Sequence, residues 1–143
     1  MLGMKVIILP GYSEKNKIWA EEAHVVVGSS EVVSWPHWGK AGSTFSPDEE
    51  AKKLFKIYSA EPGVSILAKS VGTLVAVKLI VKLETRVKRV VLCGIPTNDL
   101  DESKGDMSAY KSLDLIDAEN ILCIQNENDY HGGYEEARKL IEK

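Results

Sequence analysis

Short apolar runs rich in β-branched residues alternate along this chain with segments that have the residue pattern of helices. The apolar runs are KVIILP (5–10), EVVSW (31–35), VSILA (64–68), VKRVVLCG (87–94) and NILCIQN (120–126). The helix-like segments are 16–28, 46–60, 71–84, 109–116 and 133–143. Continuous apolar runs of this length are typical of strands buried on both faces of a parallel sheet. The alternation therefore predicts a three-layer α/β/α sandwich with right-handed crossovers.

The segment 46–60 has the clearest helix boundaries. Ser46 precedes Pro47 and a first turn of acidic residues, a pattern that places the N-cap at Ser46 and the first helical residue at Pro47. Glu49 lies three residues after Ser46 and completes a capping-box pattern. The segment 71–84 is the most apolar of the helix-like segments, so we expect it to be the most buried.

Size and charge limit the class of protein. A chain of 143 residues suits one domain, spanning 1–143, with a single core. The net charge is −3, and basic residues are scattered among acidic ones. The charges therefore give no reason to expect binding to nucleic acid or to an anionic membrane. No run approaches the roughly 20 apolar residues of a membrane span. The start, MLGMKVIILPGY, is typical of a buried strand rather than a signal peptide, so we expect a cytoplasmic protein.

Two cysteines, Cys93 and Cys123, fall within predicted strands. Neither has a cluster of metal-ligating residues nearby in the sequence, so the pattern does not predict a zinc site. We expect both to be buried free thiols. The sequence likewise gives no reason to expect another metal or a cofactor.

The strongest motif is the serine in AKSVG, residues 68–72. A nucleophilic serine on a sharp turn between a strand and a helix needs small residues two positions before and after it, in the pattern Gly-x-Ser-x-Gly. Ala68 and Gly72 occupy those positions here. Ser70 has a second interpretation, because serine is also a favoured helix N-cap. Lys69 is adjacent to Ser70 on an extended segment, so we expect its side chain to point away from Ser70.

Four stretches together resemble the α/β-hydrolases, in particular the small, lidless serine hydrolases that contain little more than the core sheet. These stretches are IILPGYSEKNKIW, AKSVGTLVA, RVVLCGIP and ILCIQNENDYHGG. The resemblance implies a minimal α/β-hydrolase core with a five-stranded parallel sheet of order 2-1-3-4-5. Flavodoxin-like folds share that order, so topology alone does not establish the function.

The resemblance also implies roles for individual residues. Ser70 is the expected nucleophile and Asp129 the expected acid. The backbone N–H groups of Val71 and Tyr12 would form the oxyanion hole, and Gly11 would allow the backbone to turn there. The implied reaction is hydrolysis of a small-molecule ester, thioester or amide.

The chain departs from the family at the histidine. The family order is serine, acid, histidine, with the histidine on a loop after one further strand, but this sequence ends 14 residues after Asp129. Of its three histidines, His24 falls within a predicted helix, and His37, beside Trp38, is expected to line the substrate pocket. His131 is the candidate base, oriented either by Asp129 or by Asp99. A fragment whose histidine lies beyond residue 143 is the alternative.

Other functions stay open at this point. A non-catalytic binding module on the same fold would explain the missing histidine loop. A flavodoxin-like nucleotide or flavin binder is disfavoured, because PGYSEKN lacks the glycine patterns that hold phosphates. An open parallel sheet has two bare edges, which allows a homodimer formed edge to edge.

Overall fold

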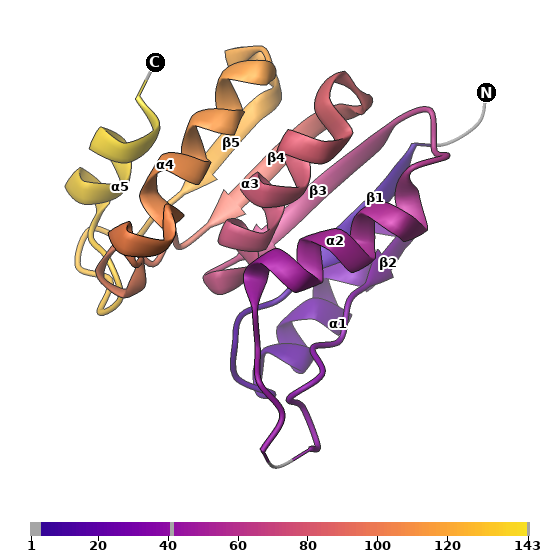
Figure 1. Cartoon of the computed structure of the whole chain (residues 1–143), viewed down its shortest axis with the longest axis horizontal. Coiled ribbons are helices and arrows are strands. Elements are labelled where there is room, and N and C mark those ends of the chain that lie inside the picture. The colour runs from indigo at the N-terminus through magenta and orange to yellow at the C-terminus, as the bar shows by residue number, and fades with distance from the viewer. Residues whose placement is uncertain (1–3, 41, 143) are drawn as a thin grey trace.

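A single parallel sheet forms the centre of the molecule in the computed structural model, which describes residues 4–40 and 42–142 (Figure 1). Its strands are β1 (Lys5–Leu9), β2 (Ser30–Val32), β3 (Val64–Lys69), β4 (Val87–Cys93) and β5 (Ile121–Ile124). The spatial order is β2-β1-β3-β4-β5 and every neighbouring pair is parallel. The predicted fold class and strand order are therefore confirmed.

Helices follow the strands in the predicted alternation, but the α-helix expected over 109–116 is mostly the 3₁₀ helix η4 (Tyr110–Leu115). The α-helices are α1 (Asn16–Val27), α2 (Pro47–Tyr58), α3 (Val71–Leu83), α4 (Asp106–Ala109) and α5 (Tyr134–Ile141). Short 3₁₀ turns are η1 (Glu84–Arg86), η2 (Thr97–Asp99), η3 (Glu102–Lys104), η4 (Tyr110–Leu115) and η5 (Ala118–Asn120). None of the helices within residues 4–40 and 42–142 has the length and apolar character needed to cross a membrane.

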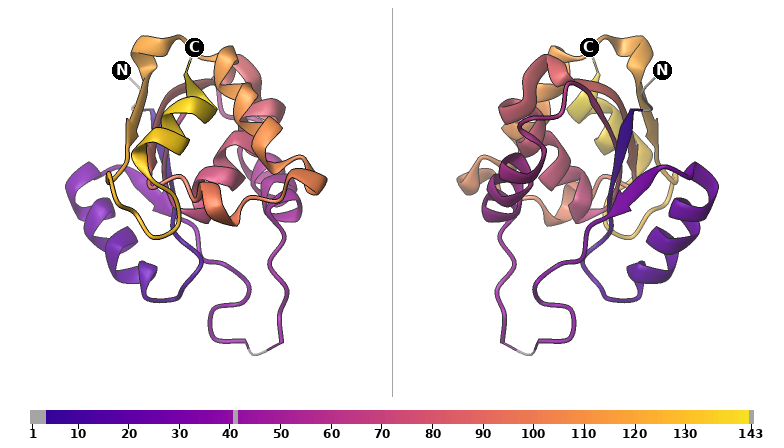
Figure 2. Two further views of the ribbon diagram at one scale, coloured as in Figure 1. Left: turned by 90° about the vertical axis from the view of Figure 1, so that its left-hand side faces the viewer. Right: turned by 90° about the vertical axis from the view of Figure 1, so that its right-hand side faces the viewer.

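The two faces of the sheet are covered unequally (Figure 2). One face packs against α2, α3 and the α4–η4 segment, and α3 is the most buried helix, as expected. The other face carries α1. On that side Leu122 and Ile124 of β5 are 55% and 52% exposed. The expectation that strands are buried on both faces is therefore wrong for β5.

Burial alternates along β3 and shows the same difference between the two faces of the sheet. Val64, Ile66 and Ala68 are buried in the core with α3, whereas the intervening residues are partly exposed on the α1 side. Side chains alternate between the two faces of a strand. Lys69, the last residue of β3, therefore lies on the more open face.

Two predicted segments differ in detail. The strand expected over 31–35 ends at Val32, because the chain then turns so that Trp35 Nε1 donates hydrogen bonds to the carbonyl oxygens of Pro10 and Gly11, both at 3.1 Å. The polar loop expected over 95–108 instead holds two 3₁₀ turns and the start of α4. The first departure arises from a contact between segments that are distant in the sequence. In the second, local bonds form the turns: the Ser103 N–H donates to Asp101, and the Asp101 N–H donates to Asp106, both at 2.9 Å.

The N-terminus of α2 is built as predicted. Ser46 Oγ accepts a hydrogen bond from the backbone N–H of Glu49 at 3.3 Å, and Pro47 is the first helical residue. The carboxylate of Glu49 bonds Lys52 rather than the Ser46 backbone. The capping box is therefore formed in one of its two directions.

Candidate active site

Ser70 lies on a sharp turn between β3 and α3. Its backbone has φ 53° and ψ −123°, a conformation that residues other than glycine rarely adopt. Its side chain makes no capping hydrogen bond to α3. The structure thus removes the helix-cap interpretation and shows the strained turn that the AKSVG motif predicts.

Small residues flank the turn because backbone atoms approach it closely. A β-carbon built on Gly72 would lie 2.3 Å from the carbonyl oxygen of Leu9 and 2.7 Å from that of Pro10. Ala68, two residues before Ser70, is fully buried. Its methyl group fits within the core, so alanine is tolerated where the motif has its first glycine.

A hydrogen-bond relay fixes the Ser70 backbone. Its N–H donates to the Cys93 carbonyl at 2.9 Å, and its carbonyl accepts from the Thr73 hydroxyl at 2.7 Å. The Thr73 hydroxyl is also 2.7 Å from the Tyr110 hydroxyl. Thr73 has one hydroxyl hydrogen, which Ser70 uses, so Tyr110 donates to Thr73. Burial raises the pKa of Tyr110 well above its usual range, which keeps this donor protonated.

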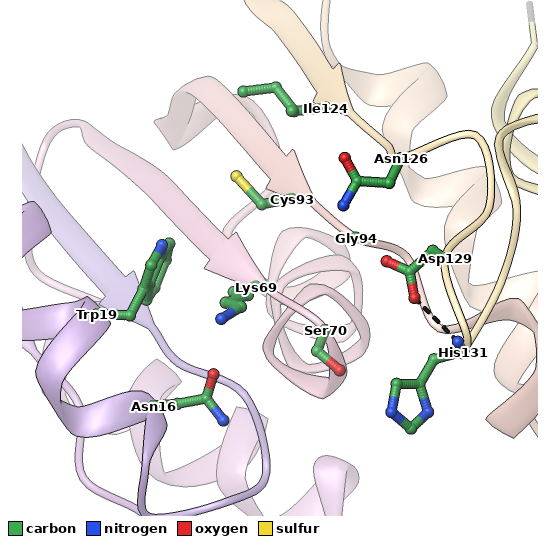
Figure 3. Close-up of a pocket in the computed structure, with 10 residues that line it drawn as sticks. All are labelled: Asn16, Trp19, Lys69, Ser70, Cys93, Gly94, Ile124, Asn126, Asp129 and His131. Carbon is green, nitrogen blue, oxygen red and sulfur yellow. Dashed lines mark hydrogen bonds between the residues drawn. The ribbon is translucent and has the colours of Figure 1, made fainter.

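A cavity of about 350 Å³ opens beside Ser70 (Figure 3). Its lining residues are Asn16, Trp19, Lys69, Ser70, Cys93, Gly94, Ile124, Asn126, Asp129 and His131. The tertiary structure thus brings the predicted residues Ser70, Asp129 and His131 to one cavity. Asn16, Trp19, Cys93 and Asn126 join them, and no sequence motif pointed to these four.

The imidazole of His131 is paired with Asp99. Nδ1 of His131 lies 2.7 Å from Oδ2 of Asp99, although 32 residues separate them in the sequence. Asp129 instead accepts a hydrogen bond from the backbone N–H of His131 at 2.9 Å, drawn as the dashed line in Figure 3. Of the two acids that the sequence left open as partners of the imidazole, the one in contact is Asp99. The hydroxyl of Ser70 forms no hydrogen bond within the described ranges.

Gln125 ties the His131 loop to the segment after β4. Its side-chain oxygen accepts from the backbone N–H of Ile95 at 2.7 Å, and its nitrogen donates to the carbonyls of Ile95 and Gly132 at 3.0 Å and 2.6 Å. Asn98 adds a backbone bond to the His131 carbonyl at 2.8 Å. These bonds hold the Asp99 and His131 segments together. Gln125 was not predicted as a site residue, because a glutamine at the end of an apolar run matches no motif.

The predicted pocket residues Gly11, His37 and Trp38 do not line the Ser70 cavity. His37 Nε2 and Trp38 Nε1 lie 2.6 Å and 2.8 Å from the Tyr12 carbonyl, and the Tyr12 ring stacks on His37 at 4.1 Å. A carbonyl only accepts, so His37 Nε2 carries a hydrogen and donates it. Gly11 does not have positive φ; its lack of a side chain makes room for Asn16. These residues hold the β1–α1 loop in place.

The two backbone N–H groups predicted to form the oxyanion hole are those of Val71 and Tyr12. Val71 is the first residue of α3, where N–H groups have no intrahelical partner. Neither Val71 nor Tyr12 donates its N–H to another residue in the described part of the chain. Neither residue is among those that line the Ser70 cavity, so their role as oxyanion donors stays a prediction.

Both cysteines are free and half-buried, so the prediction of free thiols is confirmed and their burial is less complete than expected. Burial raises the pKa of the Cys93 thiol, and the positive charge of Lys69 partly opposes this. Burial raises the pKa of Cys123 to about 11. Within residues 4–40 and 42–142, no group of three or more histidine, cysteine, aspartate or glutamate side chains is arranged to hold a metal ion.

No model of a protein family matches the chain, and no curated protein matches its sequence significantly. The function of the protein is therefore inferred from the geometry of the Ser70 cavity.

Proposed function

We propose that this protein is a serine hydrolase that uses Ser70 as its nucleophile on a small ester, thioester or amide. The observation that carries the proposal is the φ of 53° at Ser70, in a strand-to-helix turn that presents this residue at a cavity. Backbone strain of this kind costs about 1–3 kcal/mol and is concentrated at functional sites. The α/β-hydrolase resemblance of the sequence agrees with this assignment.

In the proposed mechanism, His131 is the general base and Asp99 orients it. The carboxylate accepts the Nδ1 hydrogen, which leaves Nε2 as the atom that takes the proton from the Ser70 hydroxyl. The bond between Ser70 Oγ and the substrate carbonyl carbon then forms, and the bond to the leaving group breaks as His131 protonates it. Water activated by His131 hydrolyses the acyl-enzyme. Catalytic hydrogen bonds often close only once substrate is bound, which accounts for the unbonded Ser70 hydroxyl.

The oxyanion of the tetrahedral intermediate would be held by the N–H groups of Val71 and Tyr12. Donors that are fixed before the reaction stabilise the developing charge without reorganising. Val71 is fixed by α3, and the peptide group that carries the Tyr12 N–H is held by the bond from Trp35 Nε1 to the Gly11 carbonyl. Removing one such donor typically costs about 100- to 1000-fold in turnover.

The test is covalent labelling with a fluorophosphonate probe, read by intact mass and peptide mapping. We expect a single adduct on Ser70, and we expect no adduct in the Ser70→Ala variant. Ser112 serves as the internal control, because its hydroxyl is buried and donates to the Val77 carbonyl. An unlabelled Ser70 in protein shown to be folded would overturn the proposal.

A non-catalytic binding module is the second candidate. It is favoured by one observation, the absence of a bond from the Ser70 hydroxyl to His131 or any other residue within 4–40 and 42–142. This alternative predicts that Ser70→Ala leaves ligand binding unchanged and that the probe labels no serine.

A further inference from the structure

Lys69 is a cation at the wall of the Ser70 cavity. Its ammonium nitrogen lies 5.4 Å from the centre of the Trp19 ring. Across the described ranges, no aspartate or glutamate is within 4.0 Å of it. Lys69 points toward Trp19 while both it and Ser70 line the same cavity (Figure 3). The prediction that Lys69 turns away from Ser70 therefore does not remove it from the site.

The ends of the cavity differ in charge. Figure 3 shows Trp19, Asn16 and Lys69 at one end, Asp129 and His131 at the other, and Ser70 between them. Asp129 and Asp99 make the His131 end acidic. The ring of Trp19 helps hold the Lys69 ammonium at its end, because the face of an indole attracts a cation. An elongated substrate with one negative charge would therefore bind in one direction.

The reaction fixes which part of the substrate meets Lys69. His131 delivers the proton to the leaving group, so the leaving group departs on the His131 side of Ser70. The acyl chain then extends toward Lys69 and Trp19. A carboxylate at the far end of that chain would pair with the ammonium group, and the adjacent Asn16 amide offers a neutral hydrogen-bond donor.

We infer that the substrate is an acidic ester or thioester, whose acyl chain ends in a carboxylate that Lys69 binds. This inference rests on the proposed hydrolase function. In the reaction, the bond from Ser70 Oγ to the acyl carbon forms and the bond to the leaving group breaks. The serine proton passes through His131 to the leaving oxygen or sulfur. Water then releases a short dicarboxylate and restores the serine hydroxyl.

The first experiment compares two chromogenic esters of matched length, mono-p-nitrophenyl glutarate and p-nitrophenyl pentanoate. They differ in a terminal carboxylate against a methyl group. We expect wild-type protein to prefer the glutarate ester in kcat/KM, and Lys69→Met to lower the glutarate-to-pentanoate ratio about tenfold, the effect of one charge-assisted hydrogen bond. Lys69→Arg should retain most of the preference. Added salt should reduce the preference in wild-type protein.

Lys52→Met is the matched control, since Lys52 is an exposed lysine on α2 that pairs with Glu49 and lies outside the cavity. It should leave the ratio unchanged. An equal loss of activity toward both esters in Lys69→Met, or an unchanged ratio, would overturn the inference.

A binding measurement separates this inference from the hydrolase proposal. The binding of glutarate to Ser70→Ala protein is followed through the NMR signal of the Trp19 indole N–H, assigned with Trp19→Phe. We expect saturable shifts that the additional Lys69→Met substitution abolishes. If neither ester is hydrolysed but glutarate binding depends on Lys69, the hydrolase proposal fails and the anion site stands. If both esters are hydrolysed but glutarate binds equally well with and without the Lys69→Met substitution, the inference fails and the hydrolase proposal stands.

Discussion

Gly72 of α3 touches the end of β1 so closely that a β-carbon there would lie 2.3 Å from the carbonyl oxygen of Leu9. Tyr12, the second predicted oxyanion donor, lies three residues after Leu9, in the loop between β1 and α1. This contact therefore sets the spacing between the Ser70 turn and the β1–α1 loop.

Gly72→Ala should destabilise the protein by about 2 kcal/mol, in the range for overpacking a core, although alanine favours helices. Chemical denaturation measures this change. Gly63→Ala is the control, because its β-carbon would meet the flexible side chain of Lys88 at 3.3 Å. Gly63→Ala should change the free energy of unfolding by no more than about 0.5 kcal/mol. Equal stability of the two variants would show that the Leu9 contact is not limiting.

Backbone strain at Ser70 predicts an order of stability between two inactive variants. Ser70→Ala keeps a β-carbon at φ 53°, whereas Ser70→Gly removes it. We expect Ser70→Gly to be more stable than Ser70→Ala by about 1 kcal/mol, and both to lose probe labelling. Urea denaturation of the two proteins measures the difference. A less stable glycine variant would argue against strain at this turn.

The two acids near His131 should respond differently to amide substitution. Asp99→Asn removes the charge beside Nδ1 and should slow Ser70 labelling about 100-fold, less than the ~10⁴-fold effect in a buried triad because this pair is exposed to water. Asp129→Asn keeps an oxygen that can accept from the His131 backbone and should change the rate only a few-fold. Labelling rates for the two variants decide the matter. The reverse order would assign the orienting role to Asp129.

The relay behind Ser70 can be shortened one bond at a time. Tyr110→Phe removes the donor to Thr73 and should cost about 1 kcal/mol of stability, while the bond to the Ser70 carbonyl remains. Thr73→Val also removes the bond to the Ser70 carbonyl and should slow probe labelling as well. Stability from denaturation and rates from labelling are measured in parallel. Identical labelling rates in the two variants would show that the Thr73 bond does not position Ser70.

The raised pKa values of the two cysteine thiols predict that the rate of alkylation and the stability of the protein change at alkaline pH. The pKa of Cys123 is raised to about 11 and that of Cys93 is raised as well, so alkylation by iodoacetamide should be slow near neutral pH and accelerate above pH 9. The folded state holds these protons more tightly than the unfolded state. The stability that this provides is therefore complete below the ordinary thiol pKa and is lost as pH rises toward 11.

Two variants check this assignment. Lys69→Met removes the charge that lowers the Cys93 pKa, so it should slow alkylation of Cys93 further. Cys123→Ala should reduce the loss of stability between pH 9 and 11. Fast alkylation of Cys123 at neutral pH would contradict the expected burial.

Local patterns were sufficient for the elements and their order. The five apolar runs predicted the strands, and Ser46 with Pro47 predicted the start of α2. The spacing of Ala68, Ser70 and Gly72 predicted a tight turn, although the atom that leaves no room for a side chain at Gly72 is the Leu9 carbonyl oxygen, which is distant in the sequence.

The assembly of the cavity was decided by tertiary structure. The sequence left Asp99 and Asp129 as alternatives for His131, and the choice depends on Gln125 and on bonds between two loops that follow different strands. His37 was expected in the pocket, but contacts with Tyr12 hold it elsewhere.

Patterns along the chain were thus enough to predict the parallel sheet and the alternation of its helices, because hydrophobic periodicity is a local property. The same patterns left Ser70 open between a nucleophile turn and a helix cap. The folded arrangement settles which acid pairs with the His131 imidazole and which cation shares the cavity with Ser70. Those pairings depend on side chains brought together from the ends of separate strands. Their distances follow from packing between elements, which no short stretch of sequence contains.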